Sequence, residues 1–201
     1  LKYKKIDLIK NYFSDVDDII LLNNHKLNLN YQDNNLSVKG EGEIQFLNDE
    51  VNQIKYLVKK KDKDLNISTD LFLKNIHLKS QDFLKNFFPK IKKKIILNNQ
   101  KIKINYNNNN LSFSGSGNFK IDKDFEKIDF SFEKKRKKIK FNTKLNIKNT
   151  EFKIENINFQ KKSNSEMLLQ IKGELRDSKN LNLNNFVINE ENNNIKIKNL
   201  S

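Results

Sequence analysis

Two histidines are the side chains best suited to acid–base chemistry near neutral pH in this 201-residue chain. The imidazoles of His25 and His77 could exchange a proton with a substrate or bind a metal ion. The chain repeats itself, however, and the repeat aligns His25 with Gln100 and His77 with Glu151. Because neither histidine recurs, we expect both to be surface residues of strands rather than catalytic or metal-binding residues.

The other residues that could support chemistry do not form a binding motif. Asp15, Asp17 and Asp18 lack the spacing of a calcium loop, and lysines stand at the aligned positions of the second copy. The Gly-x-Gly pairs fall within predicted strands, where they cannot cradle a phosphate. The sequence has no cysteine, and it has no P-loop, nucleophile elbow or dinucleotide fingerprint. We expect no catalytic site, no cofactor and no metal.

The chain is strongly basic, with a formal net charge of +14. Such a charge is typical of proteins that bind nucleic acid or an anionic membrane surface. Here the lysines are spread along the polar faces of alternating segments among many asparagines, a bias that an AT-rich genome produces without selection for binding. We therefore interpret the charge as compositional. Neither a signal sequence nor an apolar run of about 18 residues occurs, so we expect no part of this sequence to span a membrane. The chain begins at Leu1 without Met. We expect it to be an internal segment of a longer protein whose targeting elements lie elsewhere.

An internal repeat is the strongest signal in the sequence. Gly40 and Gly42 in LSVKGEGEIQF recur as Gly115 and Gly117 in LSFSGSGNFKI, at an offset of 115 − 40 = 75 residues. Residues 8–24 likewise align with residues 83–99, and the second copy loses one residue after its glycines. We therefore expect one unit over residues 1–80, a second over residues 81–155, and a diverged or truncated third over residues 156–201. In the third unit, Gly173 is aligned with Gly40 and Gly115.

The spacing of apolar residues predicts a short helix at the start of each unit. Helical intervals separate two sets of residues, which are Ile9, Tyr12, Phe13, Val16 and Ile20, and then Leu84, Phe87, Phe88, Ile91 and Ile95. Pro89 lies inside the second set, and we expect it to kink that helix or to start it afresh.

The rest of each unit alternates apolar and polar residues with the period of a β-strand. Turn residues separate these runs at 32–35, 60–64, 107–110 and 134–138. The pattern predicts a mainly β fold, a repetitive antiparallel meandering sheet with about four or five strands per unit. All five glycines fall on the apolar face of the predicted strands. A bulge or bend of the sheet would explain them, and so would room for a ligand or another backbone.

These features resemble the AsmA-like proteins of Gram-negative envelopes, of the YhdP and TamB type, within the repeating-β-groove class of bridge-like lipid-transfer proteins. The resemblance covers roughly residues 6–155. It includes both Gly-x-Gly strands, the segment NFFPKIKKK and the long alternating strands that follow. It implies a taco-like sheet curved into an elongated groove, whose concave apolar face holds phospholipid acyl chains. It also implies a periplasmic segment of a protein anchored in the inner membrane by parts outside this chain, with a role in outer membrane biogenesis.

The period of two predicts which side chains face the lipid. The expected groove lining is Leu29, Tyr31, Val38, Ile44, Phe46, Ile54, Tyr56, Ile104, Tyr106, Phe113, Phe119, Ile128, Phe130, Phe132, Phe141 and Leu145. On the opposite face, we expect Lys39, Lys55 and Lys140 to point to solvent.

Two other functional classes remain open from the sequence. The same alternation fits a closed β-sandwich that acts as a scaffold or adhesin, with a dry interior. A basic sheet could also bind nucleic acid or an anionic polymer. That second interpretation is disfavoured because the aromatic residues and the lysines alternate onto opposite faces.

Overall fold

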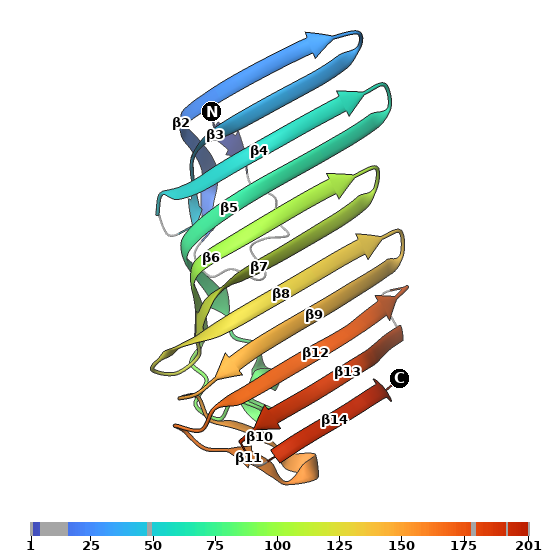
Figure 1. The fold of residues 1–201 in the computed structure, drawn as a ribbon. Coiled ribbons are helices and arrows are strands. Elements are labelled where there is room, and N and C mark those ends of the chain that lie inside the picture. Colours follow the sequence, from blue (N-terminus) through green and yellow to red (C-terminus); the bar gives the residue numbers. More distant parts are fainter. Residues whose placement is uncertain (1, 5–15, 48–49, 178–179, 192, 201) are drawn as a thin grey trace.

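The fold is one large β-sheet with a small hairpin beside it. The computed structural model describes residues 2–4, 16–47, 50–177, 180–191 and 193–200. Within them, twelve strands form a single sheet in chain order (Figure 1), while β10 (Phe152–Ile154) and β11 (Phe159–Lys161) pair separately. The strands of the large sheet are β1 (Lys2–Lys4), β2 (Val16–Gln32), β3 (Asn35–Leu47), β4 (Asn52–Lys61), β5 (Asp64–Lys79), β6 (Lys94–Asn107), β7 (Asn110–Lys120), β8 (Phe125–Lys135), β9 (Lys138–Ile147), β12 (Met167–Arg176), β13 (Asn180–Glu190) and β14 (Asn193–Leu200). The predicted antiparallel meander is confirmed.

Tight turns join the strands where the sequence predicted them. The first hairpin of each long unit turns at Asp33 and Asn34, and then at Asn108 and Asn109, with all four residues at positive φ. Two successive residues of positive φ match the twist of paired strands, and Asn and Asp adopt this conformation more readily than most residues. Each long unit thus supplies four strands, β2–β5 and β6–β9.

The prediction of a short helix at the start of each unit was wrong for the residues that the structure describes. The second one is reduced to the short 3-10 helix η2 (Asp82–Asn86), and Ile95 belongs to β6. Pro89 has no N–H to donate and disfavours a helical conformation in the residue before it, so the helix cannot continue. Of the first predicted helix, Val16 and Ile20 lie in β2, and the other members of the pattern lie outside the described residues.

The first strand of each long unit contains a bulge. The register of β2 with β3 shifts between residues 23 and 26, and that of β6 with β7 shifts between residues 98 and 101. Asn24 and Asn99 have φ values of 52° and 51° at these points. Because a bulge bends a strand and increases its twist, these sites curve the sheet. Figure 1 shows strands of the sheet turning backward toward their left-hand ends.

Gly42 and Gly117 make room for the bulged residues. A Cβ atom on Gly42 would lie 2.6 Å from Cδ2 of His25, and one on Gly117 would lie 2.6 Å from Cδ of Gln100. The predicted link between glycine and bulge is therefore correct, but the bulge lies in the neighbouring strand. His25 and Gln100 occupy equivalent positions, as the repeat alignment requires.

Gly40 and Gly115 lie under an aromatic ring from the next strand. Gly40 pairs directly with Tyr56, and Gly115 pairs directly with Phe130. A Cβ atom on Gly115 would lie 2.5 Å from Cζ of Phe130, and a Cβ atom on Gly40 would also clash with the ring of Tyr56. The two glycines therefore have the same environment in the sheet, and the ring that covers each one shields its backbone.

Gly173 is not the third member of this set. It lies in β12, the neighbour of β9 in the large sheet, so its strand runs antiparallel to the strands that hold Gly40 and Gly115. A Cβ atom on Gly173 would lie 2.6 Å from the backbone oxygen of Asn182 and 2.8 Å from Cζ of Phe141. The absence of a side chain at Gly173 therefore allows the close approach of the β13 backbone, at the register shift between β12 and β13.

We expect Gly173→Ala to lower the free energy of unfolding by about 1–3 kcal/mol, as overpacking typically does. Gly115→Ala should cost less, because the ring of Phe130 can rotate away whereas the carbonyl of Asn182 belongs to the backbone. Urea unfolding of both variants measures the difference. Equal losses would contradict the backbone clash as the cause.

The core lies at one end of the strands. The buried members of its larger cluster come from β7 and the loop after it, from β9, β12 and β13, from β10 and β11, and from the loop after η2; they are Phe88, Phe119, Ile121, Ile147, Phe152, Phe159, Met167, Leu169 and Ile188. The smaller cluster contains Leu73 and Ile76 of β5. Phe152 contacts the rings of Phe87, Phe88 and Phe159, with centroid distances of 6.1, 5.2 and 6.3 Å. The η2 loop and the β10–β11 hairpin together form a cover over this end of the sheet.

Candidate functional site

One face of the large sheet, here named the apolar face, presents rows of apolar side chains that cross it from strand to strand. Direct pairing aligns one such row across ten strands, from β2 to β13. Its members are Leu27, Gly40, Tyr56, Thr69, Ile104, Phe113, Phe132, Phe141, Gly173 and Leu183. The row contains no charged residue, so an apolar path runs perpendicular to the strands.

Most of the predicted lining residues lie on this face outside the core. Alternation along the strands and pairing between them place Leu29, Tyr31, Val38, Ile44, Ile54, Tyr56, Ile104, Tyr106, Phe113, Phe130, Phe132 and Phe141 there. Phe119, by contrast, is buried in the core, and Ile128 and Leu145 pack against that core. Phe46 lies in β3, but its side chain is outside the described residues.

The apolar face is uncovered toward the hairpin turns. Leu27, Leu29 and Tyr31 are 64%, 66% and 65% exposed. Further along the same face, Phe113 stacks on Phe132 with a centroid distance of 4.7 Å, and both rings are half-buried. Within the described residues, the only other sheet is the two-stranded β10–β11 hairpin. The closed sandwich therefore does not describe this part of the chain.

The opposite face is polar and basic, as the period of two predicted. Lys39, Lys55 and Lys140 are exposed on it, and Lys55 forms an ion pair with Glu41 at 3.3 Å. Phe72 is an exception to the alternation, because it lies on this face beside Lys101. Together with neighbouring lysines, it lines a cavity of about 580 Å³.

A buried lysine holds the cover in place. Lys161, in β11, is fully buried, and its Nζ donates hydrogen bonds to the backbone oxygens of Lys148, Thr150 and Lys162 at 2.7, 3.0 and 2.9 Å. The ammonium group thus uses all three of its N–H donors. Burial lowers the pKa of Lys161, and the negative charge of Glu126 opposes this shift.

Glu126 binds the same loop from the other side. This buried carboxylate, at the start of β8, accepts hydrogen bonds from the backbone N–H groups of Lys148, Asn149 and Thr150 at 3.0, 2.6 and 3.0 Å. In the loop before β10, the backbone N–H groups therefore donate to the carboxylate of Glu126, and the backbone carbonyls accept from the ammonium group of Lys161. A buried charged network whose groups all have hydrogen-bond partners makes the backbone that it binds more rigid.

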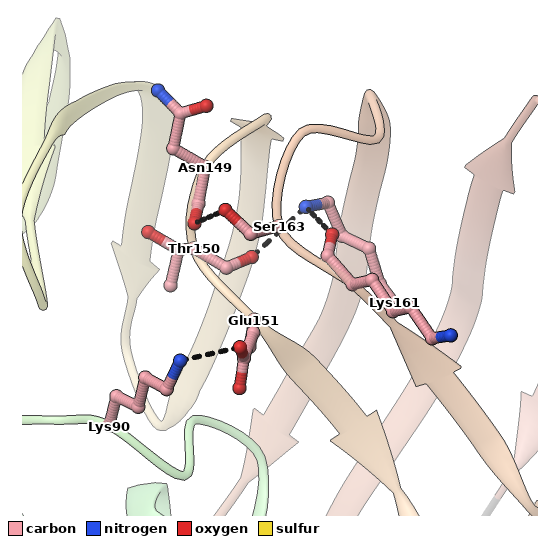
Figure 2. A network of polar contacts seen from close by, with 7 residues as sticks. Lys90, Asn149, Thr150, Glu151, Lys161 and Ser163 are labelled. Carbon is pink, nitrogen blue, oxygen red and sulfur yellow. Dashed lines mark hydrogen bonds and ion pairs between the residues drawn. The ribbon is translucent and has the colours of Figure 1, made fainter.

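Further contacts join the η2 loop to the hairpin and join the two segments that flank the hairpin. Figure 2 shows Lys90, which follows η2, reaching Glu151 with an Nζ to Oε1 distance of 2.6 Å. The figure also shows Ser163 donating to the backbone oxygen of Asn149 at 2.9 Å. The hydrogen bond to Glu151 raises the pKa of Lys90. The cover thus combines these polar contacts with the cluster of phenylalanine rings around Phe152.

Sequence reasoning missed this network, although the repeat contains a signal for it. Glu126 aligns with Asn52, and both are buried polar residues at positions of the apolar alternation. Asn52 accepts a hydrogen bond from the N–H of Lys74 at 2.9 Å, just as Glu126 accepts one from its repeat equivalent, Lys148. A polar residue that recurs on an apolar face was the available clue.

The two histidines considered as candidate catalytic residues both lie in strands of the large sheet. His25 is half-buried, its Nε2 lies 3.0 Å from the backbone oxygen of Glu43, and its ring lies 6.0 Å from that of Tyr56. His77 is half-buried in β5, opposite Ile96. Both therefore belong to strands, but they are less exposed than predicted. The side chains of the acidic cluster at residues 15–18 lie outside the described residues.

Among the described side chains, no group of three or more His, Cys, Asp or Glu residues is arranged to hold a metal ion. The same part of the chain contains no helix that is both long and apolar enough to cross a membrane. No family model, curated protein or solved structure matches the chain. The uncovered apolar face is therefore the principal candidate site, and its function has to be argued from its geometry.

Proposed function

We propose that this chain is a segment of a bridge-like, AsmA-like lipid-transfer protein, in which the apolar face binds phospholipid acyl chains and no catalysis takes place. The observation that supports this most directly is the uncharged row that crosses ten strands. With strands about 4.8 Å apart, such a row is about 43 Å long. That length suits extended acyl chains that move along it.

The attraction between the face and the lipid would be apolar and non-directional. Each methylene that leaves water contributes roughly 0.8 kcal/mol, whichever part of the row it contacts. A chain can therefore slide between positions of similar free energy. The bulges at Asn24 and Asn99 support a sheet curved into an elongated groove, because they bend the first strand of each unit.

The location that we propose follows from the same resemblance. In this proposal the chain is a periplasmic segment of a protein anchored in the inner membrane, and it works in outer membrane biogenesis. The repeated units would extend one apolar path along the parent protein.

Lipid that co-purifies with the chain tests this proposal. We expect native mass spectrometry of gently purified protein to detect adducts with the masses of phospholipids, and organic extraction to remove them. Protein that stays free of lipid, even after incubation with phospholipid vesicles, would contradict the proposal.

The cavity beside Phe72 favours a second candidate function. An aromatic ring among Lys55, Lys101 and Lys103 is a feature of surfaces that bind single-stranded nucleic acid or another anionic polymer. This function would require binding that weakens steeply with salt, and it would require loss of binding in Phe72→Ala. Binding that is independent of salt would exclude it.

A further inference from the structure

The hairpin turns of the sheet lie along one long edge, here named the open rim. It contains turns at residues 33–34, 62–63, 108–109 and 136–137, and it borders the uncovered part of the apolar face. Asn-rich turns and basic turns alternate along it. The segment 59–64 has four lysines and two aspartates, and the segment 133–138 has five basic residues and one glutamate. Positive charge is therefore concentrated at the second turn of each long unit.

One lysine in each of these basic turns projects from the apolar face. Lys60 pairs with Leu36 on one side and Leu65 on the other. Lys134, its equivalent in the second unit, pairs with Leu111 and Ile139. Paired residues share a face, so both lysine side chains project from positions between apolar residues at the margin of the apolar face. Both lysines are exposed, and neither forms an ion pair with another described residue.

Tyrosine hydroxyls mark the same margin. Tyr31 donates a hydrogen bond to Oδ1 of Asn34 at 3.2 Å, and Tyr106 donates one to Oδ1 of Asn109 at 3.4 Å. Each ring lies on the apolar face while its hydroxyl reaches the turn. From the interior of the face to the rim, the order is therefore apolar side chains, then hydroxyl and ammonium groups. A phospholipid has the same order, from its acyl chains to its phosphate.

We propose that Lys60 and Lys134 bind the headgroup phosphate of phospholipids whose acyl chains lie on the apolar face. This inference rests on the proposed function, and it defines the cargo as lipid with a phosphate in its headgroup. Each long unit then offers one phosphate position. The two positions are four strands apart in the sheet, or about 19 Å. An ammonium group at such a position attracts phosphate as a point charge, without requiring one fixed lipid orientation.

The test compares two lipids with the same acyl chains, fluorescent phosphatidylglycerol and fluorescent diacylglycerol. We expect Lys60→Gln/Lys134→Gln to weaken phosphatidylglycerol binding by about three- to tenfold. Diacylglycerol binding should not change, because that lipid has no phosphate. Lys61→Gln/Lys135→Gln is the matched control, because it removes the same charge from adjacent, repeat-equivalent positions on the opposite face.

Each outcome decides between the two proposals. Selective loss of phosphatidylglycerol binding in the Lys60/Lys134 variant supports the headgroup site. Equal loss in both variants would mean that net charge alone matters, and it would overturn the site. Unchanged binding in both variants would also overturn it, while diacylglycerol binding would leave the lipid function standing. Failure of the parent chain to bind either lipid would overturn both proposals.

Discussion

Lys161→Met is expected to lower the free energy of unfolding by about 3–5 kcal/mol, the typical cost of breaking a buried charged network. The variant leaves the carbonyls of Lys148, Thr150 and Lys162 without their Lys161 donor, and it removes the positive charge of Lys161 that interacts with Glu126. Each buried group that loses its partner costs about 1–3 kcal/mol. Methionine retains most of the side-chain volume, so the effect reports the polar contacts. Urea unfolding measures it.

Lys162→Met is the matched control, because Lys162 is the exposed neighbour of Lys161. We expect that change to fall within about 0.5 kcal/mol of the parent. Hydrogen exchange adds a local readout, because the amides of residues 148–161 should lose protection first in Lys161→Met. Similar stability in the two variants would show that the network does not hold the cover.

The pKa of Lys161 gives this prediction a pH dependence. Burial lowers that pKa below its ordinary value of 10.5, so the unfolded chain binds the proton more tightly than the folded chain. Between the folded and unfolded pKa values, the unfolded state then has more protons bound, and stability rises with pH. The deficit of Lys161→Met relative to the parent should therefore grow as the pH rises from 7 toward 10.5. A deficit that shrinks over this range would contradict the direction of the shift.

Phe113→Asp is expected to reduce lipid binding by at least about tenfold, because acyl chains on the apolar face would bury its carboxylate without a partner. The side chain projects from the uncovered part of this face, so without lipid the carboxylate reaches water. The chain should therefore stay folded, with a loss of roughly 1–2 kcal/mol that includes the stacking on Phe132. Lipid binding and the thermal midpoint should be measured on the same preparation.

Ser114→Asp provides the control for this experiment. Ser114 is the next residue of β7, it is exposed, and it lies on the opposite face, where it pairs with Ser131. The same added charge should leave lipid binding unchanged. Ile128→Asp, in contrast, should destabilise the fold itself, because Ile128 packs against the core. If Ser114→Asp abolished lipid binding as Phe113→Asp does, the apolar face would not be the site.

The strands, their faces and their turns could be predicted from the sequence because they depend on local properties. Alternation places Ile104 and Tyr106 on one face and Lys103 on the other, whatever lies above the sheet. Asn108 and Asn109 adopt positive φ at low cost, which places a turn between β6 and β7. The repeat extended these predictions from one unit to the next, including the equivalent environments of Gly40 and Gly115.

The tertiary structure alone decided which part of the apolar face is covered. Phe113 and Phe119 are identical in type and in parity along β7, yet one lies in the uncovered region and the other in the core. The difference arises because the η2 loop and the β10–β11 hairpin pack over one end of the strands. Alternation encodes the face on which a side chain lies, but it does not encode what packs against that face. The failed helix has a similar cause, since the spacing of Phe87, Phe88 and Ile91 serves contacts with the core, and Pro89 prevents a helix. The pairing of Lys161 with the loop that Glu126 binds joins residues far apart in the chain, so only the folded arrangement could reveal it.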